Sequence, residues 1–171
     1  VFSTENWNRP KSEVNFLFNL IKTYFKNDIK DVVKNGIKIN ILGNTKPLQK
    51  NIKIILKEAV KKTIKNKKIL VNLALNYGSK NEIKNAFNKM LGKKVKFTNK
   101  NITKNLYTKN LPDPDILIRT GGKKRLSNFM LWQLAYAELY FIDKLWPDFN
   151  EKDLKKIIYN FKSIKRNFGG I

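Results

Sequence analysis

The chain has 171 residues, and 42% of them are hydrophobic, which is enough to bury one sizeable core. It has no cysteine and no histidine, so disulfides, thiolate chemistry, imidazole acid–base catalysis and histidine-ligated metals are excluded, and a bound metal would need oxygen ligands. The formal charge of +23 is carried mostly by lysines scattered along the chain, and because no nucleic-acid-binding motif accompanies them we expect no nucleic-acid partner.

The first third of the chain is predicted to form a strand end, a long helix and a second strand. Residues 1–2 look like the end of a strand that enters a polar turn directly, so we expect a domain truncated at its N-terminus. From Ser12, a plausible N-cap, apolar residues recur at helical spacing until Gly36. Isoleucine then alternates with lysine and asparagine, which predicts a strand over residues 37–43.

Helices and strands continue to alternate in the rest of the chain. The predicted elements are a helix from Pro47, a buried strand over 69–75, a helix over 83–90, a short strand over 115–119, a helix from Ser127 and a terminal helix after Asn150. Such alternation implies a mostly parallel sheet flanked by helices. We therefore predict an α/β fold in one domain over residues 1–171.

The segment that follows the strand at 115–119 has the composition of a diphosphate-binding loop. The chain has four arginines, and two of them, Arg119 and Arg125, lie here on either side of two glycines. A planar guanidinium can bind two diphosphate oxygens at once, and Ser127 adds a hydroxyl near the start of a predicted helix, whose amides would add further donors. The alternative is a solvated basic loop, and the sequence of the loop alone does not decide between the two.

Glu138 is the second candidate for chemistry, because it is the only acid between Asp115 and Asp143 and lies in an apolar, aromatic segment. A carboxylate in such surroundings is costly unless it is paired or binds a cation. One interpretation is an ion pair with Arg119 or Arg125. The other is a metal ion bound together with a diphosphate, which would use the carboxylate and the arginines at once.

Polar segments also follow two other predicted strands, at residues 3–10 and 76–78. In α/β folds, ligands bind beyond the carboxyl ends of the strands, so both segments are candidates for a site. Trp7 lies between Asn6 and Arg9 in the first segment, where its ring could face an apolar substrate or cover a site.

The other tryptophans and the last arginine have simpler interpretations. Trp132 and Trp146 are expected in the core. Arg166 precedes a Phe-Gly-Gly sequence, and we expect it to act as an ordinary cation and cap at the end of the terminal helix.

Four segments together resemble the motifs of one enzyme family. They read Phe-Ser-Thr-Glu-Asn-Trp-Asn-Arg-Pro at 2–10, Asn-Tyr-Gly at 76–78, Ile-Arg-Thr-Gly-Gly at 118–122 continuing to Arg-Leu-Ser-Asn-Phe at 125–129, and Trp-Gln at 132–133 continuing to Ala-Glu-Leu-Tyr-Phe at 137–141. In order and spacing they resemble the cis-prenyltransferases, with the greatest likeness to bacterial undecaprenyl diphosphate synthases. The resemblance runs from the first residue almost to the last.

The resemblance implies a central parallel sheet with surrounding helices, a hydrophobic tunnel and a homodimer. It also implies an Mg²⁺-dependent enzyme that condenses isopentenyl diphosphate onto an allylic diphosphate, usually farnesyl diphosphate. The product would be a long cis-polyprenyl diphosphate, such as the undecaprenyl lipid carrier of cell-wall synthesis. The helix from Ser12 and the strand from Ile69 would line the apolar cavity, and product release would favour a membrane surface.

The same resemblance assigns roles to individual residues. Arg119, Arg125 and Ser127 would hold isopentenyl diphosphate, and Glu138 would help to bind the Mg²⁺ associated with it. The segment of residues 3–9 would lie at the reacting centre: Asn6 and Arg9 beside the reacting atoms, with Ser3, Trp7 and Arg9 in contact with substrate.

Two departures from the family pattern limit this assignment. The upstream Asp-Gly-Asn-Gly-Arg type of loop, with its metal-binding aspartate, is not in this sequence, so the chain as shown is expected to be inactive alone. Asn167 stands where the family often has a second arginine, which could weaken substrate binding or the dimer.

The alternative functions are a non-catalytic scaffold subunit of a prenyltransferase complex and, less favoured, a basic nucleic-acid-binding module. No apolar run is long enough to span a bilayer and no signal peptide is evident, so a cytoplasmic location, with peripheral membrane contact, is expected.

Overall fold

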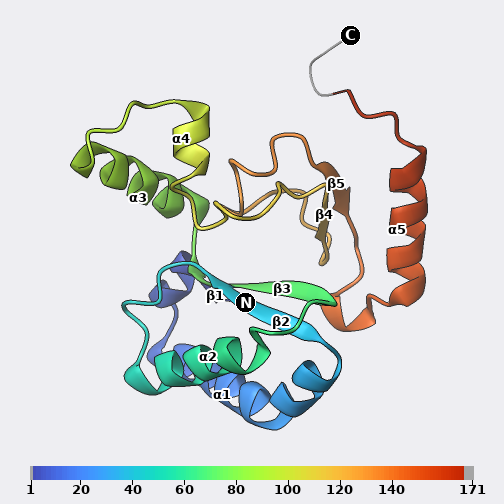
Figure 1. The fold of residues 1–171 in the computed structure, drawn as a ribbon. Coiled ribbons are helices and arrows are strands. Elements are labelled where there is room, and N and C mark those ends of the chain that lie inside the picture. Colours follow the sequence, from blue (N-terminus) through green and yellow to red (C-terminus); the bar gives the residue numbers. More distant parts are fainter. Residues whose placement is uncertain (1, 168–171) are drawn as a thin grey trace. The chain divides into compact units, whose positions relative to one another are not determined.

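The computed structural model describes residues 2–167, and the chain divides into two compact units, Val1–Lys109 and Asn110–Ile171. The first unit contains a sheet of three parallel strands in the order β1–β3–β2 (Figure 1). Its strands are β1 (Phe2–Ser3), β2 (Ile37–Leu42) and β3 (Ile69–Tyr77). β2 and β3 pair along their length, from Ile37 opposite Ile69 to Leu42 opposite Ala74.

Two helices, α1 (Lys11–Lys34) and α2 (Lys50–Thr63), cover one face of this sheet (Figure 1). Their apolar stripes and the inward side chains of the strands form the main core. It consists of Phe2, Val14, Phe18, Phe25, Ile29, Ile39, Leu48, Ile52, Leu56, Ala59 and Leu75. Burial of each large apolar side chain contributes about 1.5–3 kcal/mol, so this cluster is the main source of stability of the unit.

Thr63 is a polar residue buried where α2 meets the edge strand β2. Its Oγ1 accepts a hydrogen bond from the Ile39 N–H at 3.1 Å and donates to the Ala59 carbonyl at 2.8 Å. The hydroxyl therefore satisfies a backbone donor of β2 inside the core and ties the helix to the strand.

Gly43 follows β2 and passes directly against the end of β3. Its φ is +119°, and a Cβ at this position would lie 2.1 Å from the carbonyl oxygen of Leu75. Only glycine combines this backbone conformation with so close an approach. The next residue, Asn44, donates its N–H to the Asn76 carbonyl at 3.3 Å, which holds the two strand ends together.

Two more helices follow β3 in the first unit, α3 (Ser79–Gly92) and the short α4 (Asn99–Thr103). α3 begins immediately after Gly78, so its N-terminus lies at the carboxyl end of β3. Ala86 and Met90 are fully buried on its inner face.

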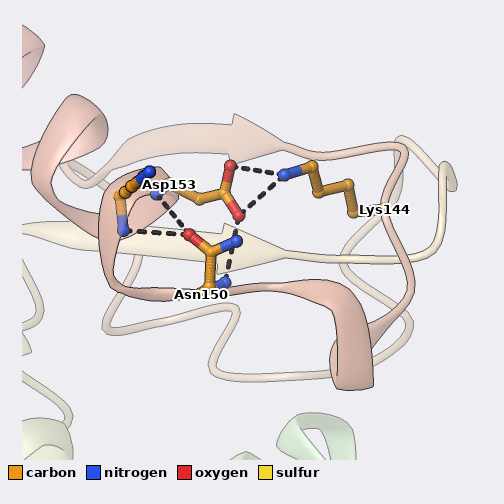
Figure 2. Close-up of polar contacts among 4 residues, drawn as sticks. Lys144, Asn150 and Asp153 are labelled. Atoms are coloured by element: carbon orange, nitrogen blue, oxygen red, sulfur yellow. Dashed lines mark hydrogen bonds and ion pairs between the residues drawn. The ribbon is translucent and has the colours of Figure 1, made fainter.

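The second unit contains two parallel strands, β4 (Ile116–Arg119) and β5 (Glu138–Phe141), with Ile116 opposite Glu138 and Arg119 opposite Phe141. The 3₁₀ helix η2 (Trp146–Asp148) and the helix α5 (Glu151–Ser163) follow. Figure 2 shows how α5 begins: Asn150 accepts the N–H groups of Lys152 and Asp153, and the Asp153 carboxylate accepts the Asn150 N–H and pairs with Lys144 at 2.8 Å.

The structure confirms the mixed α/β class and the parallel pairing of the strands, with three strands in one unit and two in the other. Two expectations are wrong. Residues 127–137 form turns rather than a helix, because Ser127, Asn128 and Met130 have φ values between +47° and +60°, which an α-helix cannot accommodate. Trp146 is 74% exposed, where we expected a core residue, and stacks on Phe149 with ring centroids 6.2 Å apart.

No helix within residues 2–167 is long and apolar enough to cross a membrane.

Candidate functional site

Arg119 and Ser127, two of the predicted diphosphate ligands, are in direct contact. Arg119 is the last residue of β4, and its Nη1 donates to the Ser127 Oγ at 2.9 Å and to the backbone carbonyl of Arg125. The contact closes the loop between them and brings the three residues of the predicted isopentenyl diphosphate site together. The side chain of Arg125 is exposed.

The two glycines of this loop use their amides inside the protein. Gly121 donates its N–H to the Lys144 carbonyl at 2.8 Å, and Gly122 donates to the Ile142 carbonyl at 3.0 Å. Both glycines have positive φ, which lets the chain turn back along the exit of β5. The loop is therefore fixed to the segment that follows β5, and the donors it offers to an anion come from side chains rather than from the glycine amides. Because no helix starts at Ser127, the expected helix amides do not contribute either.

Glu138 lies at the other end of the same strand pair. It is the first residue of β5, opposite Ile116, whereas Arg119 is opposite Phe141. The backbones of Glu138 and Arg119 are therefore three residues apart along the strand direction, which corresponds to about 10 Å. The Glu138 side chain is half-buried, and within residues 2–167 its carboxylate forms no ion pair, so the predicted alternative of a pair with Arg119 or Arg125 is wrong.

A cavity of about 260 Å³ adjoins Glu138. It is lined by Tyr136, Ala137, Glu138, Lys165, Arg166 and Asn167. Asn167, the residue that departs from the family pattern, therefore lies beside the predicted metal ligand of its own chain. Arg166 lies beyond the end of α5, which finishes at Ser163, so it is not a cap of that helix. The Phe-Gly-Gly sequence from which a cap was expected lies outside the described residues.

Glu138 offers a single carboxylate to a metal. In the part of the chain that the structure describes, no group of three or more acidic side chains lies close enough to hold a metal ion. Mg²⁺ usually keeps several waters and takes one or two carboxylates together with substrate phosphates. A lone, half-buried carboxylate at a cavity fits such a site better than an all-protein cage.

The predicted residues of the N-terminal segment lie in the first unit, in and around the 3₁₀ helix η1 (Thr4–Asn8). Asn6 lies inside η1 and bonds to the residues that cap its two ends: its Oδ1 accepts the Ser3 N–H at 2.6 Å, and its carbonyl accepts the Arg9 N–H at 3.1 Å. Arg9 is exposed and makes a long contact of 3.4 Å with Glu13. Asn6 thus shapes the segment, and the Arg9 guanidinium remains accessible.

Trp7 is held by a residue that sequence analysis did not connect with it. Its Nε1 donates to the Asn76 Oδ1 at 2.7 Å, and the Asn76 Nδ2 donates to the Asn44 carbonyl at 2.8 Å. The indole ring also packs on Phe2 and Phe18, with centroids 5.1 and 5.7 Å away. Asn76 has a φ of +48°, and its side-chain amide links η1 and the segment after β2 to the end of β3.

Glu82 is a buried carboxylate that the motifs did not indicate. It is 1% exposed, accepts the Tyr77 hydroxyl at 2.5 Å on Oε2, and accepts the Tyr107 N–H at 2.7 Å on Oε1. Its place in the first turn of α3 was the available signal, since carboxylates favour helix N-termini. The contacts fix the segment at Tyr107 to the end of β3. A cavity of about 490 Å³ adjoins this region, lined by Thr4, Trp7, Asn44, Pro47, Asn76, Gly78, Asn81, Lys84, Asn85 and Tyr107.

An apolar cavity of about 160 Å³ lies between α1 and the sheet. It is lined by Tyr24, Phe25, Asp28, Ile29, Val32, Ile37, Ile39, Val71 and Leu73. These residues come from α1, β2 and β3, and α1 and β3 are the two elements that we expected to line an apolar cavity.

Comparison with known proteins identifies the family. The family model for undecaprenyl diphosphate synthase matches residues 1–169. The chain belongs to the undecaprenyl diphosphate synthase family. It is 43% identical over 171 residues to an isoprenyl transferase of Fusobacterium nucleatum, covering 99% of this chain and 74% of that protein. It is 44% identical over 169 residues to an isoprenyl transferase of Rickettsia typhi, covering 98% and 75%.

Two solved structures of the undecaprenyl diphosphate synthase type of fold match almost the whole chain. The crystal structure of a probable undecaprenyl diphosphate synthase from Campylobacter jejuni has a TM-score of 0.90 at 36% identity, and covers 99% of this chain and 80% of that one. Lavandulyl diphosphate synthase from Lavandula x intermedia, in complex with dimethylallyl diphosphate, has a TM-score of 0.91 at 32% identity, with 99% and 76% covered. The family and the fold class predicted from the sequence are thereby confirmed, and the family supports prenyl transfer as the activity.

Proposed function

We propose that the protein elongates a prenyl chain in the cis configuration, condensing isopentenyl diphosphate onto an allylic diphosphate, with farnesyl diphosphate as the primer. The product would be a long polyprenyl diphosphate, such as undecaprenyl diphosphate for the lipid carrier of cell-wall synthesis. The observation that carries this proposal is the contact of Arg119 with Ser127 at the carboxyl end of β4 in a chain of this family.

Arg119, Arg125 and Ser127 would bind the diphosphate of isopentenyl diphosphate. Within residues 2–167 the Arg119 Nη1 is the atom engaged with the loop, so its remaining N–H groups can point to a ligand while Nη1 keeps the loop closed. The exposed Arg125 side chain adds a second cation. Charge-assisted hydrogen bonds of this kind are about twice as strong as neutral ones, so these residues would dominate the affinity for the substrate.

Asn6 and Arg9 would lie at the reacting carbon, with Ser3 and Trp7 shaping the segment around it. The double bond of isopentenyl diphosphate attacks the allylic carbon, the carbon–oxygen bond to the leaving diphosphate breaks, and loss of a proton completes each addition. Arg9 would stabilise the negative charge that develops on the leaving diphosphate, since its guanidinium is accessible. Asn6 would keep the segment in shape through its capping contacts.

We infer that Glu138 would supply a carboxylate to Mg²⁺. The ion, when bound, would neutralise charge on the diphosphate groups. The role of Glu138 would be to hold its carboxylate, half-buried and without an ion pair among residues 2–167, at a fixed place beside the substrate.

The apolar cavity between α1 and the sheet supports a path for the product chain. Its volume of about 160 Å³ is below the roughly 300–1,000 Å³ that encloses a drug-sized ligand, so it would hold only part of a long chain. The tunnel, the single domain, the homodimer, the cytoplasmic location and release of the product at a membrane surface remain predictions.

The test of the function uses the complete protein with Mg²⁺, farnesyl diphosphate and labelled isopentenyl diphosphate, and resolves the extracted products by chain length and double-bond geometry. A ladder that ends in a long cis-polyprenyl diphosphate is the expected result. A protein that is folded by circular dichroism but incorporates no label would instead favour the scaffold subunit.

The site assignment is tested by Arg119→Ala against a matched control, Lys124→Ala, which removes an exposed cation of the same loop that forms no hydrogen bond or ion pair within the described residues. Loss of a charge-assisted hydrogen bond costs about 1.5–3 kcal/mol, so the KM for isopentenyl diphosphate should rise roughly 10- to 150-fold in Arg119→Ala. The control should change it less than about threefold, because a solvated lysine acts only through screened charge. Equal effects in the two variants would contradict the assignment.

A further inference from the structure

Arg166 donates two hydrogen bonds in the second unit to residues outside the helix that precedes it. Its Nη1 donates to the Asp115 Oδ1 at 2.5 Å and its Nη2 donates to the Tyr136 carbonyl at 3.1 Å. The guanidinium also lies over the Phe161 ring, 5.2 Å from the centroid. We call this set of contacts the Arg166 bridge. Its arginine side chain is 19% exposed, whereas Asp115 is 66% exposed.

Both anchor points of the bridge adjoin the Glu138 backbone, one by a hydrogen bond and one along the chain. Asp115 accepts the Glu138 N–H on its own carbonyl at 2.9 Å, and Tyr136 lies two residues before Glu138. A closed ring of contacts therefore runs from the Asp115 side chain through Arg166 to Tyr136, along the chain to Glu138, and back to the Asp115 backbone.

The segment that leads into Glu138 has little regular structure of its own. Residues 127–137 form turns, and β5 begins only at Glu138. The first residue of a strand has no strand residue before it to fix its direction, so contacts from outside the strand decide where its side chain points. The Arg166 bridge supplies such contacts on the entry side.

We propose that Arg166 is a positioning residue that fixes the entry to β5, and with it the Glu138 carboxylate, for metal binding. The inference rests on the proposed metal role of Glu138 and extends it to a residue and a mechanism outside the diphosphate loop. An arginine is needed because one planar fork satisfies a carboxylate and a carbonyl at once, which a lysine ammonium cannot do in the same geometry.

Energy in the ion pair itself is not the basis of the effect. With Asp115 mostly exposed, the charge attraction is screened and contributes little to stability. The effect lies in orientation: residues that orient a metal ligand without touching the metal typically change affinity or activity by about 10- to 100-fold when removed.

The experiment measures Mn²⁺ binding by electron paramagnetic resonance in the complete protein with isopentenyl diphosphate and without an allylic primer, so that no turnover occurs. The variants are Arg166→Gln, Arg166→Lys and the milder Asp115→Asn. Lys165→Gln is the control, because Lys165 lines the same cavity and forms no hydrogen bond or ion pair within the described residues. Thermal unfolding is recorded for each variant, and the Mg²⁺ dependence of turnover is measured separately.

We expect Arg166→Gln to weaken Mn²⁺ binding about tenfold and to raise the half-saturating Mg²⁺ concentration by a similar factor, with kcat at saturating Mg²⁺ changed less than threefold. Arg166→Lys should restore binding only in part, and Asp115→Asn should give a smaller effect in the same direction. The control should bind Mn²⁺ like the wild type. If Arg166→Gln does not fold, the Mn²⁺ affinities of Arg166→Lys and Asp115→Asn are compared with that of the control. Weaker binding in both variants than in the control would then support the inference, and equal binding would overturn it.

Unchanged metal binding with a lowered melting temperature in the Arg166 variants would overturn the inference, because the bridge would then serve stability alone. An equal loss in Lys165→Gln would also overturn it, because the loss would then come from weaker binding of the diphosphate to any cation of this cavity and not from the contacts that Arg166 makes. Glu138→Gln separates this inference from the proposed function. If that variant binds Mn²⁺ normally, the metal role of Glu138 fails and the inference with it; if it loses binding while the Arg166 variants do not, the inference alone fails.

Discussion

Replacement of Gly43 by alanine tests the close approach that joins the ends of β2 and β3. The added Cβ would lie 2.1 Å from the Leu75 carbonyl oxygen, whereas ordinary contacts begin at 3.4 Å, so the two must separate by 1.3 Å, the difference between these values. The neighbour is backbone at the end of a paired strand, so it cannot move away as a flexible side chain would. Leu75 also belongs to the core cluster.

Conformational strain adds to this clash. At a φ of +119°, a residue with a side chain is strained by about 1–3 kcal/mol, and the displaced strand end loses contacts in addition. We therefore expect the free energy of unfolding to fall by about 3–4 kcal/mol, which is large for a single substitution and a sizeable part of the 5–15 kcal/mol of a typical protein.

The assay is urea unfolding of the full-length protein followed by circular dichroism, with the midpoint and the slope fitted for each variant. Gly92→Ala is the control, because a Cβ there meets nothing within 4 Å and the residue ends a helix without positive φ. That variant should stay within about 1 kcal/mol of the wild type, on the stabilising side. A Gly43→Ala variant that is as stable as Gly92→Ala would refute the close approach of the two strands.

Three further substitutions test contacts elsewhere in the fold. Thr63→Val keeps the shape but leaves the buried Ile39 N–H without its acceptor, so calorimetry should show a loss of about 1–3 kcal/mol, and Thr63→Ser should retain most of the stability. Asn150→Ala removes the N-cap of α5 and should cost about 1 kcal/mol, or roughly 2–4 °C in melting temperature. The hydrogen bond from Lys144 lowers the pKa of the Asp153 carboxyl below its ordinary value of 3.8. Its contribution to stability is therefore complete above about pH 3.8 and is lost as the pH falls through the lowered pKa, so the urea midpoints of wild type and Asp153→Asn should converge at acidic pH. A constant difference between pH 6 and pH 3 would contradict that assignment.

Most helices and strands were predictable from the pattern of apolar residues, but α4 and β5 were not. The helices α1, α2, α3 and α5 and the strands β2, β3 and β4 all appear close to their expected positions. α4 has five residues, of which only Ile102 is buried, so no periodic signal exists. β5 was not predicted: the sequence predicted a helix from Ser127 without a defined end, because the left-handed backbone at Met130 cannot be recognised from residue type.

The candidate site shows the same division between local and distant contacts. Arg119 and Ser127 are eight residues apart in one loop, and the sequence motif already predicted that both belong to the same site. The hydrogen bond from Trp7 to Asn76 joins residues 69 apart, and the sequence gives no means of pairing them. Likewise the separation of Glu138 from Arg119 follows from the register of β4 and β5, which depends on how the intervening turns close.

The contrast between arginine and lysine in this chain carries more information than the net charge. Arg166 holds two acceptors with two guanidinium nitrogens, a planar fork that lysine lacks, and Arg119 holds two acceptors with Nη1 alone, so its other N–H groups can serve a ligand. The Arg119 contacts close the predicted diphosphate loop and the Arg166 fork holds the segment before the predicted metal ligand, so a diphosphate and its metal would meet side chains that are already oriented. The contacts that orient these long side chains are made within the protein. The conformational entropy of the side chains is therefore lost on folding rather than on binding, and each substrate in a repeated elongation would meet the same arrangement.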